Sequence, residues 1–312
     1  MAKFFIGLLI PVLILVCGAI FIVAVGDKLP VIHHQSVPDS YNIREPETVY
    51  VSDPVLEHEI RYILRKPAGS LTLRDLAGIR SLKLGNRGIK DIGALQWCTG
   101  LEHLELGNEV EMEIQNEITD IGVLSGLTHL RWLQLAGNRI TDITALRNLT
   151  NLVFLDLGYN QISDISILQN HTRLTDLRLA NNRLTDIHSL GNLRRLTILV
   201  LSGNQITNIS PLDNLVALRE LYIENNQIDN IESLRNMKDL KTLSMGSNGI
   251  SDISVLAKLS GLELLYMDHN RISNINGLRK LLKLKTLYLS NNPIRDYKPI
   301  KPLYDRLEFK DF

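Results

Sequence analysis

The amino-acid sequence predicts an elongated α/β solenoid, a horseshoe with a parallel sheet on its concave side and 3₁₀ or helical segments on its convex side. Three observations support this prediction. Leu accounts for 56 of the 312 residues, about twice its normal share. Apolar residues recur every 22 residues over most of the chain, and an Asn recurs at the same place in nearly every period. Self-similarity at a fixed period of this length is the sequence signature of a solenoid.

The period is clearest in the paired apolar residues of the Leu-x-Leu motif. The second member of each pair is Leu84, Leu106, Leu135, Leu157, Leu179, Leu201, Ile223, Met245, Met267 or Leu289. Successive members are 22, then 29, then seven times 22 residues apart, so about ten 22-residue repeats cover residues 79–300 with one seven-residue insertion.

Each repeat divides into a strand and a tight return segment. Leu133 and Leu135 alternate with other residues, which is the period of a strand with one buried face. Ile140, Ile143 and Leu146 then recur every three residues, which suits a helical or 3₁₀ return. One coil cannot bury these side chains alone, so we expect coils to stack about 4.8 Å apart around one continuous core.

Two polar rows accompany the apolar pattern. The first contains Asn116, Asn138, Asn160, Asn182, Asn204, Asn226, Asn248, Asn270 and Asn292. An amide both donates and accepts hydrogen bonds, so stacked Asn side chains can bridge neighbouring turns as a structural ladder. The second row contains Asp91, Asp120, Asp142, Asp164, Asp186, Asn208, Asn230, Asp252, Asn274 and Asp296. We interpret it as capping the start of each return segment rather than as a metal or catalytic site.

This organisation resembles the leucine-rich repeat superfamily, in particular the 22-residue class that includes bacterial internalins and the cytoplasmic regulatory subunit of protein phosphatase 1. The motif N-x-I-[TS]-D-I is present at residues 138–143 and 160–165, and the resemblance covers about 240 of the 312 residues. It implies the fold strongly and the function weakly, because the family shares a scaffold while binding unrelated partners.

The two ends of the array must be covered. We predict a helical N-terminal cap over residues 53–78, with Asp53 as N-cap and Pro54 at the first helical position. We predict a C-terminal cap over residues 301–312. The apolar cover at this end is supplied by Tyr297, Pro299, Ile300, Leu303, Tyr304 and Leu307.

Two repeats depart from the pattern. In the first, Asn86 comes one residue early and Arg87 takes the ladder position, so the ladder should begin irregularly. The second carries the insertion, whose acidic residues are Glu109, Glu111, Glu113 and Glu117. We interpret the insertion as a solvated loop, and the sequence leaves the role of residues 109–115 open.

The chain begins with an uncharged apolar segment. Residues 4–26 span 23 positions, roughly 35 Å as a helix and enough to cross a bilayer core of about 30 Å. We predict that residues 1–26 are a single-pass transmembrane signal-anchor that contacts lipid through residues 4–26, followed by a linker over residues 27–52. Lys3 favours extracytoplasmic repeats. The alternative is a signal peptide cleaved after residues 24–26, which would leave a secreted protein.

Composition narrows the function further. The chain has 34 basic and 34 acidic residues, so it lacks the basic footprint of a nucleic-acid binder. Two Cys, Cys17 and Cys98, are too few for a disulfide framework or a Cys-based zinc site. His33 and His34 have no third ligand at useful spacing, and no catalytic motif occurs. We therefore expect no enzyme, no cofactor and no metal.

The concave face offers the best candidate site. Strand residues on either side of the first Leu of Leu-x-Leu should point away from the core. The large apolar and aromatic residues at these positions are Trp132, Phe154, Ile198, Val200, Tyr222, Tyr266 and Tyr288. Nothing in the fold requires them there, and Trp and Tyr dominate protein-binding hot spots. We predict that they bind a protein or peptide partner.

The sequence therefore predicts a membrane-anchored protein-binding module that presents a leucine-rich repeat concave surface. The alternative is a cytoplasm-facing scaffold or regulatory subunit that resembles the phosphatase regulator.

Overall fold

The computed structural model describes residues 14–16, 19–21, 47–108 and 115–312. The chain divides into two units, Met1–Glu45 and Pro46–Phe312. Almost all of the described residues belong to the second unit, which contains the repeats.

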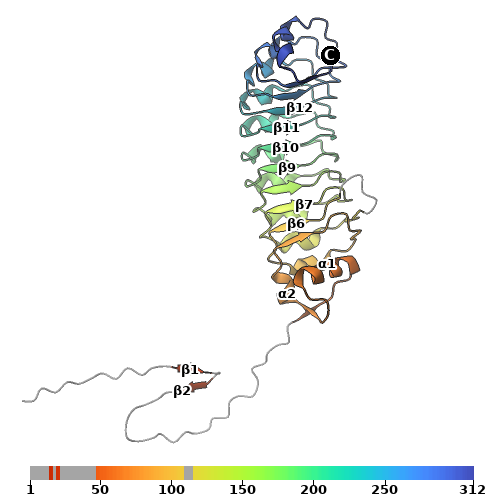
Figure 1. The fold of residues 1–312 in the computed structure, drawn as a ribbon, viewed down its shortest axis with the longest axis vertical. Helices are drawn as coiled ribbons and strands as arrows, with labels where there is room; N and C mark the ends of the chain where they lie inside the picture. Colours follow the sequence, from red (N-terminus) through yellow and green to blue (C-terminus); the bar gives the residue numbers. More distant parts are fainter. Residues whose placement is uncertain (1–13, 17–18, 22–46, 109–114) are drawn as a thin grey trace, which may run out of the picture. The chain divides into compact units, whose positions relative to one another are not determined.

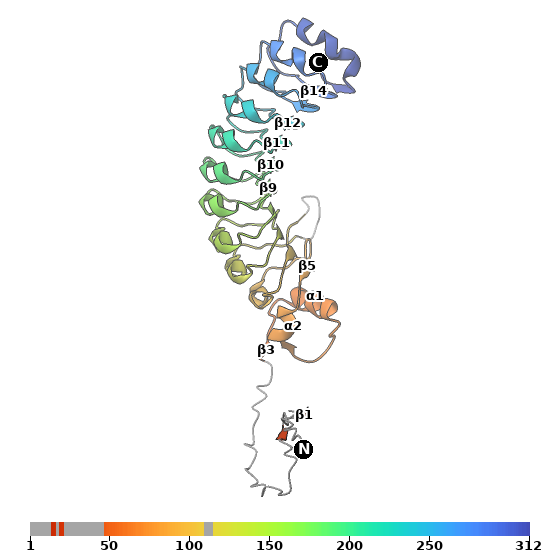
Figure 2. The same cartoon turned by 90° about the vertical axis from the view of Figure 1, so that its left-hand side faces the viewer.

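A single parallel sheet runs through the second unit. In the described residues it has 11 strands, ordered from β5 to β15 as in the sequence (Figure 1). The strands are β5 (Ser81–Lys83), β6 (His103–Glu105), β7 (Trp132–Gln134), β8 (Phe154–Asp156), β9 (Asp176–Arg178), β10 (Ile198–Val200), β11 (Glu220–Tyr222), β12 (Thr242–Ser244), β13 (Leu264–Tyr266), β14 (Thr286–Tyr288) and β15 (Phe309–Lys310). Figure 2 shows the strands along the inner side of a curved stack.

Short 3₁₀ segments occupy the outer side of the same curve (Figure 2). They are η1 (Gly93–Trp97), η2 (Gly122–Gly126), η3 (Thr144–Asn148), η4 (Ser166–Asn170), η5 (His188–Asn192), η6 (Ser210–Asn214), η7 (Glu232–Asn236), η8 (Ser254–Lys258), η9 (Asn276–Lys280) and η10 (Lys298–Arg306). The period of three between Ile and Leu residues explains the choice of 3₁₀ over α-helix, because three residues per turn return the apolar side chains to one face. The fold is the predicted solenoid.

The core is one continuous apolar cluster between the strands and the 3₁₀ segments. In a typical coil, Leu133 and Leu135 enter it from the strand side, and Ile140, Ile143 and Leu146 enter it from the return side. Four of these five side chains are fully buried, and Ile143 is 2% exposed. Each coil therefore buries its apolar residues only because another coil lies on either side.

The Asn side chains join neighbouring coils. Asn160 Oδ1 accepts a hydrogen bond from the Ile140 N–H of the preceding coil at 3.0 Å. Asn160 Nδ2 donates to the carbonyl oxygens of Leu135, in the preceding coil, and Leu157, in its own coil, at 3.0 and 3.1 Å. The same bonds recur at Asn182, Asn204, Asn226, Asn248, Asn270 and Asn292. They pair buried backbone groups that no longer have sheet partners.

The Asp and Asn residues of the second polar row stabilise the start of each 3₁₀ segment. In all ten described coils the Oδ1 atom accepts a hydrogen bond from the N–H two residues later, at 2.7–3.0 Å. The position differs by one residue from the expected N-cap, because an Ile such as Ile143 occupies the N-cap. Core packing holds that Ile inward, so the polar side chain reaches the N–H from one residue earlier.

The N-terminal end of the array is covered by a small helical subdomain. Helix α1 (Pro54–Leu64) has Asp53 as its N-cap, whose carboxylate accepts hydrogen bonds from two backbone N–H groups. Strands β3 (Thr48–Val49) and β4 (Leu71–Thr72) pair antiparallel, and helix α2 (Leu73–Ala77) follows directly. Leu56 and Ile60 of α1 are fully buried and belong to the core cluster of the repeats.

The first coils replace the regular ladder with a different set of bonds. Asn116 Nδ2 donates to Leu84 O and Leu106 O, each at 2.9 Å, and its Oδ1 accepts from Ile89 N–H at 2.8 Å. Asn108 is also buried, and its side chain bonds the backbone of Asn116. The inserted residues 109–114 lie outside the described residues. Of the predicted acidic group, Glu117 is described, and it forms an ion pair with Arg139 at 3.2 Å.

The C-terminal end contains an element that the repeat pattern does not indicate. The two residues of β15 add an eleventh strand to the sheet, with Phe309 in register opposite Thr286. Ile300 and Leu303 of η10 are fully buried. Tyr297 and Phe312 stack with ring centroids 5.3 Å apart. The cover is therefore a strand as well as an apolar helical segment.

Within the predicted anchor, residues 1–26, the structure describes only six residues. β1 (Ile14–Val16) and β2 (Ala19–Phe21) pair as antiparallel strands, which differs from the helix expected there. An apolar run does not by itself distinguish a helix from a strand, and three of these six residues, Ile14, Val16 and Ile20, are β-branched. The rest of residues 1–26, the linker residues 27–46 and the pair His33 and His34 lie outside the described residues. Among those that are described, no helix could cross a bilayer.

The buried Asn side chains of the ladder should contribute much more to the free energy of unfolding than the exposed side chains of the second polar row. Replacing Asn204 by Ala leaves Leu184 N–H and Leu179 O without their partners, so we expect the free energy of unfolding to fall by about 2–4 kcal/mol. The matched control is Asn208→Ala, which removes one exposed bond to Ser210 N–H and should lose only about 1 kcal/mol. Urea denaturation measures both, and equal losses would contradict the bridging role.

One core position of the repeats carries a histidine. His171 is fully buried where most coils have Leu, for example Leu149. Its Nε2 lies 3.0 Å from Leu146 O, which makes Nε2 the donor, and its Nδ1 is buried without a hydrogen-bond partner. Burial lowers the pKa of His171 below its ordinary value of 6.5, because the charged imidazolium loses its hydration in the apolar core.

This histidine should make the array sensitive to acid. A lowered folded-state pKa means that the unfolded chain binds the proton first, so stability falls as the pH drops below about 6.5. Between pH 7 and 5 we expect His171→Leu to lose about 1 kcal/mol less stability than the parent chain. His188→Leu, at an exposed position of η5, is the control. Parallel curves of unfolding free energy against pH for all three chains would refute this.

Candidate partner-binding surface

The strand residues on the inner side of the curve form regular rows. The parallel register pairs Trp132 with Phe154 on adjacent strands, and Val200 with Tyr222 two strands further on. The Leu between the row positions is fully buried in each strand, as Leu133 is in β7. The seven residues predicted to bind a partner therefore lie on the concave face, in two rows along the stack.

The N-terminal part of this face is a continuous stack of flat side chains. Trp132 lies against Phe154 with ring centroids 3.7 Å apart and planes 5° from parallel. On its other side, Trp132 stacks on His103 at 5.4 Å and 6°. The guanidinium of Arg178 lies over the Phe154 ring at 5.4 Å. Four successive strands, β6 to β9, thus contribute one member each to an aromatic and cationic ladder.

The stacking determines which part of each ring a partner could touch. Both faces of Trp132 are covered by neighbouring rings, yet the side chain remains 39% exposed. Phe154, in the middle of the ladder, is only 7% exposed. The ring edges are therefore the accessible parts of Trp132. Aromatic edges carry the positive end of the ring quadrupole, so they attract carbonyl and carboxylate oxygens.

The middle of the face combines apolar and acidic groups. Ile198 and Val200 of β10 are both partly exposed. On the next strand Tyr222 donates a hydrogen bond through its hydroxyl to Glu220 Oε2 at 3.0 Å. Burial, followed by this bond to a carboxylate, raises the pKa of Tyr222 to about 12. The phenol therefore stays protonated and holds Glu220 in place.

The C-terminal part carries a second aromatic pair. Tyr266 and Tyr288 have ring centroids 5.2 Å apart and planes tilted by 34°. Tyr222 lies two strands before Tyr266, with Ser244 between them in the row. The three tyrosines predicted to bind a partner are thus a pair and a separate residue, because a small side chain interrupts the row.

Beside these rows, the concave face is hollowed where the strands end. The open hollow has a volume of about 900 Å³ and is lined in part by Asp156, Arg178, Ser202 and Glu224. None of these four was among the residues predicted to bind a partner. They are polar, and apolar or aromatic character was the signal used. A search for charged residues in the same rows would have found Asp156 and Arg178.

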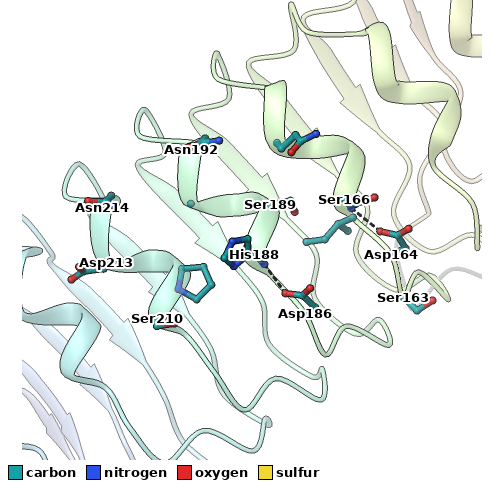
Figure 3. A pocket seen from close by; sticks show the side chains of 14 residues that line it. Ser163, Asp164, Ser166, Asp186, His188, Ser189, Asn192, Ser210, Asp213 and Asn214 are labelled. Carbon is teal, nitrogen blue, oxygen red and sulfur yellow. Dashed lines mark hydrogen bonds between the residues drawn. The ribbon is translucent and has the colours of Figure 1, made fainter.

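A second depression lies on the convex side between η4, η5 and η6 (Figure 3). Its volume is about 800 Å³, and Ser, Asn and Asp side chains make up most of its lining, together with residues such as Ile165, His188 and Pro211. Asp164 and Asp186 each accept a hydrogen bond from a backbone N–H, of Ser166 and His188 respectively. The carboxylates there already stabilise the 3₁₀ segments, so this depression is a regular consequence of the repeat.

Reactive groups are sparse in the described part of the chain. Cys98 is fully buried at the end of η1, and burial raises the pKa of its thiol to about 12. A thiol held protonated in the core is a poor nucleophile. Among the described residues, no three His, Cys, Asp or Glu side chains are grouped so that they could hold a metal ion.

The repeat geometry agrees with comparisons to known proteins. A family model of leucine-rich repeats in two copies matches residues 128–170, 172–214, 216–258 and 260–302. The chain belongs to the leucine-rich repeat family. Among curated proteins, none matches the sequence.

Several solved structures are similar to this repeat array. Internalin C2 of Listeria monocytogenes is 30% identical, with 83% of this chain and 92% of that chain covered and a TM-score of 0.50. A leucine-rich repeat protein of Leptospira interrogans is 25% identical, with 77% and 62% covered and a TM-score of 0.68. The ectodomain of an Arabidopsis thaliana membrane receptor kinase is 23% identical, with 78% and 34% covered and a TM-score of 0.60.

The aromatic ladder should contribute measurable coupling energy. In a double-mutant cycle, the free energies of unfolding of Trp132→Ala, Phe154→Ala and the double variant are compared with that of the parent chain. The coupling energy should be about 0.5–1.5 kcal/mol, because the two rings are in direct contact. The control cycle pairs Trp132→Ala with Tyr288→Ala, at the other end of the sheet, and should be additive within about 0.5 kcal/mol. Additivity in both cycles would mean that the rings do not stack in solution.

Proposed function

We propose that this chain is a membrane-anchored protein-binding module that holds a protein or peptide partner on its concave face. The binding residues are Trp132, Phe154, Ile198, Val200, Tyr222, Tyr266 and Tyr288. The anchor remains a prediction from the apolar residues 4–26, with secretion after signal cleavage as the alternative. No cofactor and no metal is part of the proposal.

The observation that carries this proposal is the position of the aromatic side chains. Trp132 is 39% exposed on a sheet face that the core does not need, and Tyr222, Tyr266 and Tyr288 are partly exposed on the same face. Removing partly exposed apolar surface from water favours association. Stacked rings are also already ordered, so binding loses little side-chain entropy there.

The stacking also favours a polypeptide over a flat ligand. A sugar or planar ring would need an open aromatic face, and both faces of Trp132 are covered. The exposed ring edges suit backbone carbonyl groups and acidic or aliphatic side chains. A protein segment supplies all of these along its length, which matches a site that extends over many strands.

Relatives of the same fold are consistent with peptide binding. The Arabidopsis thaliana receptor kinase ectodomain is in complex with Casparian strip integrity factor 2. Another structural neighbour, the plant peptide hormone receptor RGFR1, is in complex with RGF2. Because these two proteins are only 23% and 22% identical to this chain, they indicate that the fold can serve as a binding scaffold, and they do not indicate a shared ligand.

The proposal predicts that alanine at Trp132, Tyr222 or Tyr266 abolishes partner capture without unfolding the array. Each substitution removes a large, partly exposed ring, and truncation of such a hot-spot residue weakens binding by about 2 kcal/mol or more, roughly 30-fold. The measurement is affinity capture from cells that express the chain, with tagged full-length protein and mass spectrometry of the bound proteins.

Two exposed aromatic residues outside the concave face provide matched controls. Trp97 of η1 is 42% exposed and Tyr62 of α1 is 76% exposed, so Trp97→Ala and Tyr62→Ala remove similar surface elsewhere. They should leave the captured proteins unchanged. Circular dichroism tests folding of every variant. If the three concave variants capture the same proteins as the parent chain, the proposed site is wrong.

A further inference from the structure

The concave hollow carries an excess of negative charge. It lies beside strands β8 to β11, and Asp156, Arg178 and Glu224 are among its lining residues. Asp176 and Glu220 stand in the adjoining row, on β9 and β11. Four carboxylates and one guanidinium therefore lie in or beside the hollow.

Three of these carboxylates already have hydrogen-bond partners within the protein. Asp176 accepts two hydrogen bonds from Arg178, at 3.0 and 3.1 Å. Asp156 accepts from the Gly158 N–H at 2.9 Å, and burial raises the pKa of Asp156. Glu220 accepts from the Tyr222 hydroxyl. The positive charge of Arg178 is thus taken up by Asp176.

The fourth carboxylate has an unused oxygen. Glu224 Oε2 is buried and has no hydrogen-bond partner. Ser202 occupies the equivalent position one coil earlier, also lines the hollow, and is 8% exposed with a buried hydroxyl that lacks a partner. Two neighbouring coils therefore place two unpaired polar atoms at one site. A buried polar atom without a partner destabilises a protein, so a ligand that supplies the missing hydrogen bond gains affinity.

The chemistry of these groups selects the ligand. An ionised carboxylate oxygen only accepts hydrogen bonds, and a hydroxyl can accept as well as donate. The ligand must therefore bring N–H donors, and the surplus of carboxylates requires that it be positively charged. A Lys ammonium has three donors and an Arg guanidinium has five, and neither has an acceptor. Val200 lines the same hollow and offers an apolar surface to the aliphatic stem of such a side chain.

We propose that the hollow binds a Lys or Arg side chain of the partner, whose cationic head donates hydrogen bonds to Glu224 and Ser202 while its stem rests on Val200. This inference rests on the proposed function and specifies it. The partner is a protein or peptide segment that places a basic residue beside the residues contacting the aromatic ladder.

Fixed-residue peptide pools test the specificity directly. The probes are four surface-tethered dodecapeptide pools, randomised except for a central Lys, Arg, Glu or Leu, and the purified full-length chain is applied to each. A charge-assisted hydrogen bond is worth about 1.5–3 kcal/mol, so the Lys and Arg pools should bind about tenfold to hundredfold more tightly than the Leu pool. The Glu pool should bind most weakly.

The variants connect this preference to the two unpaired atoms. Glu224→Gln keeps the size of the side chain and removes its charge, so the Lys and Arg pools should bind no better than the Leu pool. Ser202→Ala should lower the preference severalfold while leaving the melting temperature unchanged or higher, because it deletes a buried hydroxyl without a partner. Glu232→Gln removes one carboxylate from η7 on the convex side and should change nothing.

The outcomes separate this inference from the proposed function. Loss of the basic preference in Glu224→Gln, with weaker binding to every pool in Trp132→Ala, supports both. Equal binding of the Lys, Arg and Leu pools by the parent chain overturns the inference and leaves the aromatic site standing, as does a preference that survives in Glu224→Gln. Absence of binding to all four pools overturns the inference, and the capture experiment then decides separately whether the concave face binds a partner.

Discussion

The whole structure depends on one constraint, which is that a 22-residue coil cannot complete itself. Its Leu side chains need apolar neighbours on both sides, and the backbone groups at its turn have no sheet partner. The Asn bridge solves the second problem: the Asn160 amide pairs the Ile140 N–H and the Leu135 carbonyl of the coil before it. Because these distances recur along the array, each coil is held in the same register as the last.

That constant register is the origin of the candidate site. Equivalent residues of successive strands lie directly opposite one another. Flat side chains at His103, Trp132 and Phe154 consequently stack. The core needs only the inward-pointing residues of each strand. The outward-pointing residues can therefore vary, and they can contact a partner. The same geometry brings Ser202 beside Glu224, one polar residue from each of two coils. Stability and recognition thus use alternate positions of the same short strands.

Periodic features were predictable because the repeat samples each position many times. The buried Leu and Ile residues, the 3₁₀ returns and the outward rows all follow from spacing. The helix after Asp53 was predictable for another reason, because Asp53 and Pro54 are typical of a helix start. Features that occur in only one coil could not be predicted from the repeat pattern. His171 fills a Leu position, Asn108 supplements the ladder, and β15 closes the sheet with two residues outside the repeat frame.

A third kind of feature is periodic in the backbone but not in residue type. The residue before the ladder Asn has positive φ in eight successive coils, from Gly137 and Tyr159 to Asn291. It is Gly, Tyr, Asn, Ser or His in different coils, so no letter pattern marks it. The hydrogen bonds of the following Asn hold the turn in this conformation.

The sequence by itself determined the stacking unit, its number of copies and the face on which each strand residue lies, because these depend only on the period of the apolar residues. The tertiary structure decided which outward residues touch. It placed both faces of Trp132 against other rings, paired Arg178 with Asp176, and left Glu224 and Ser202 each with an unpaired atom at one hollow. Such contacts depend on side-chain rotamers and, apart from the Arg178–Asp176 pair within β9, on neighbours that are 22 or more residues away in the sequence. The repeat pattern specifies neither.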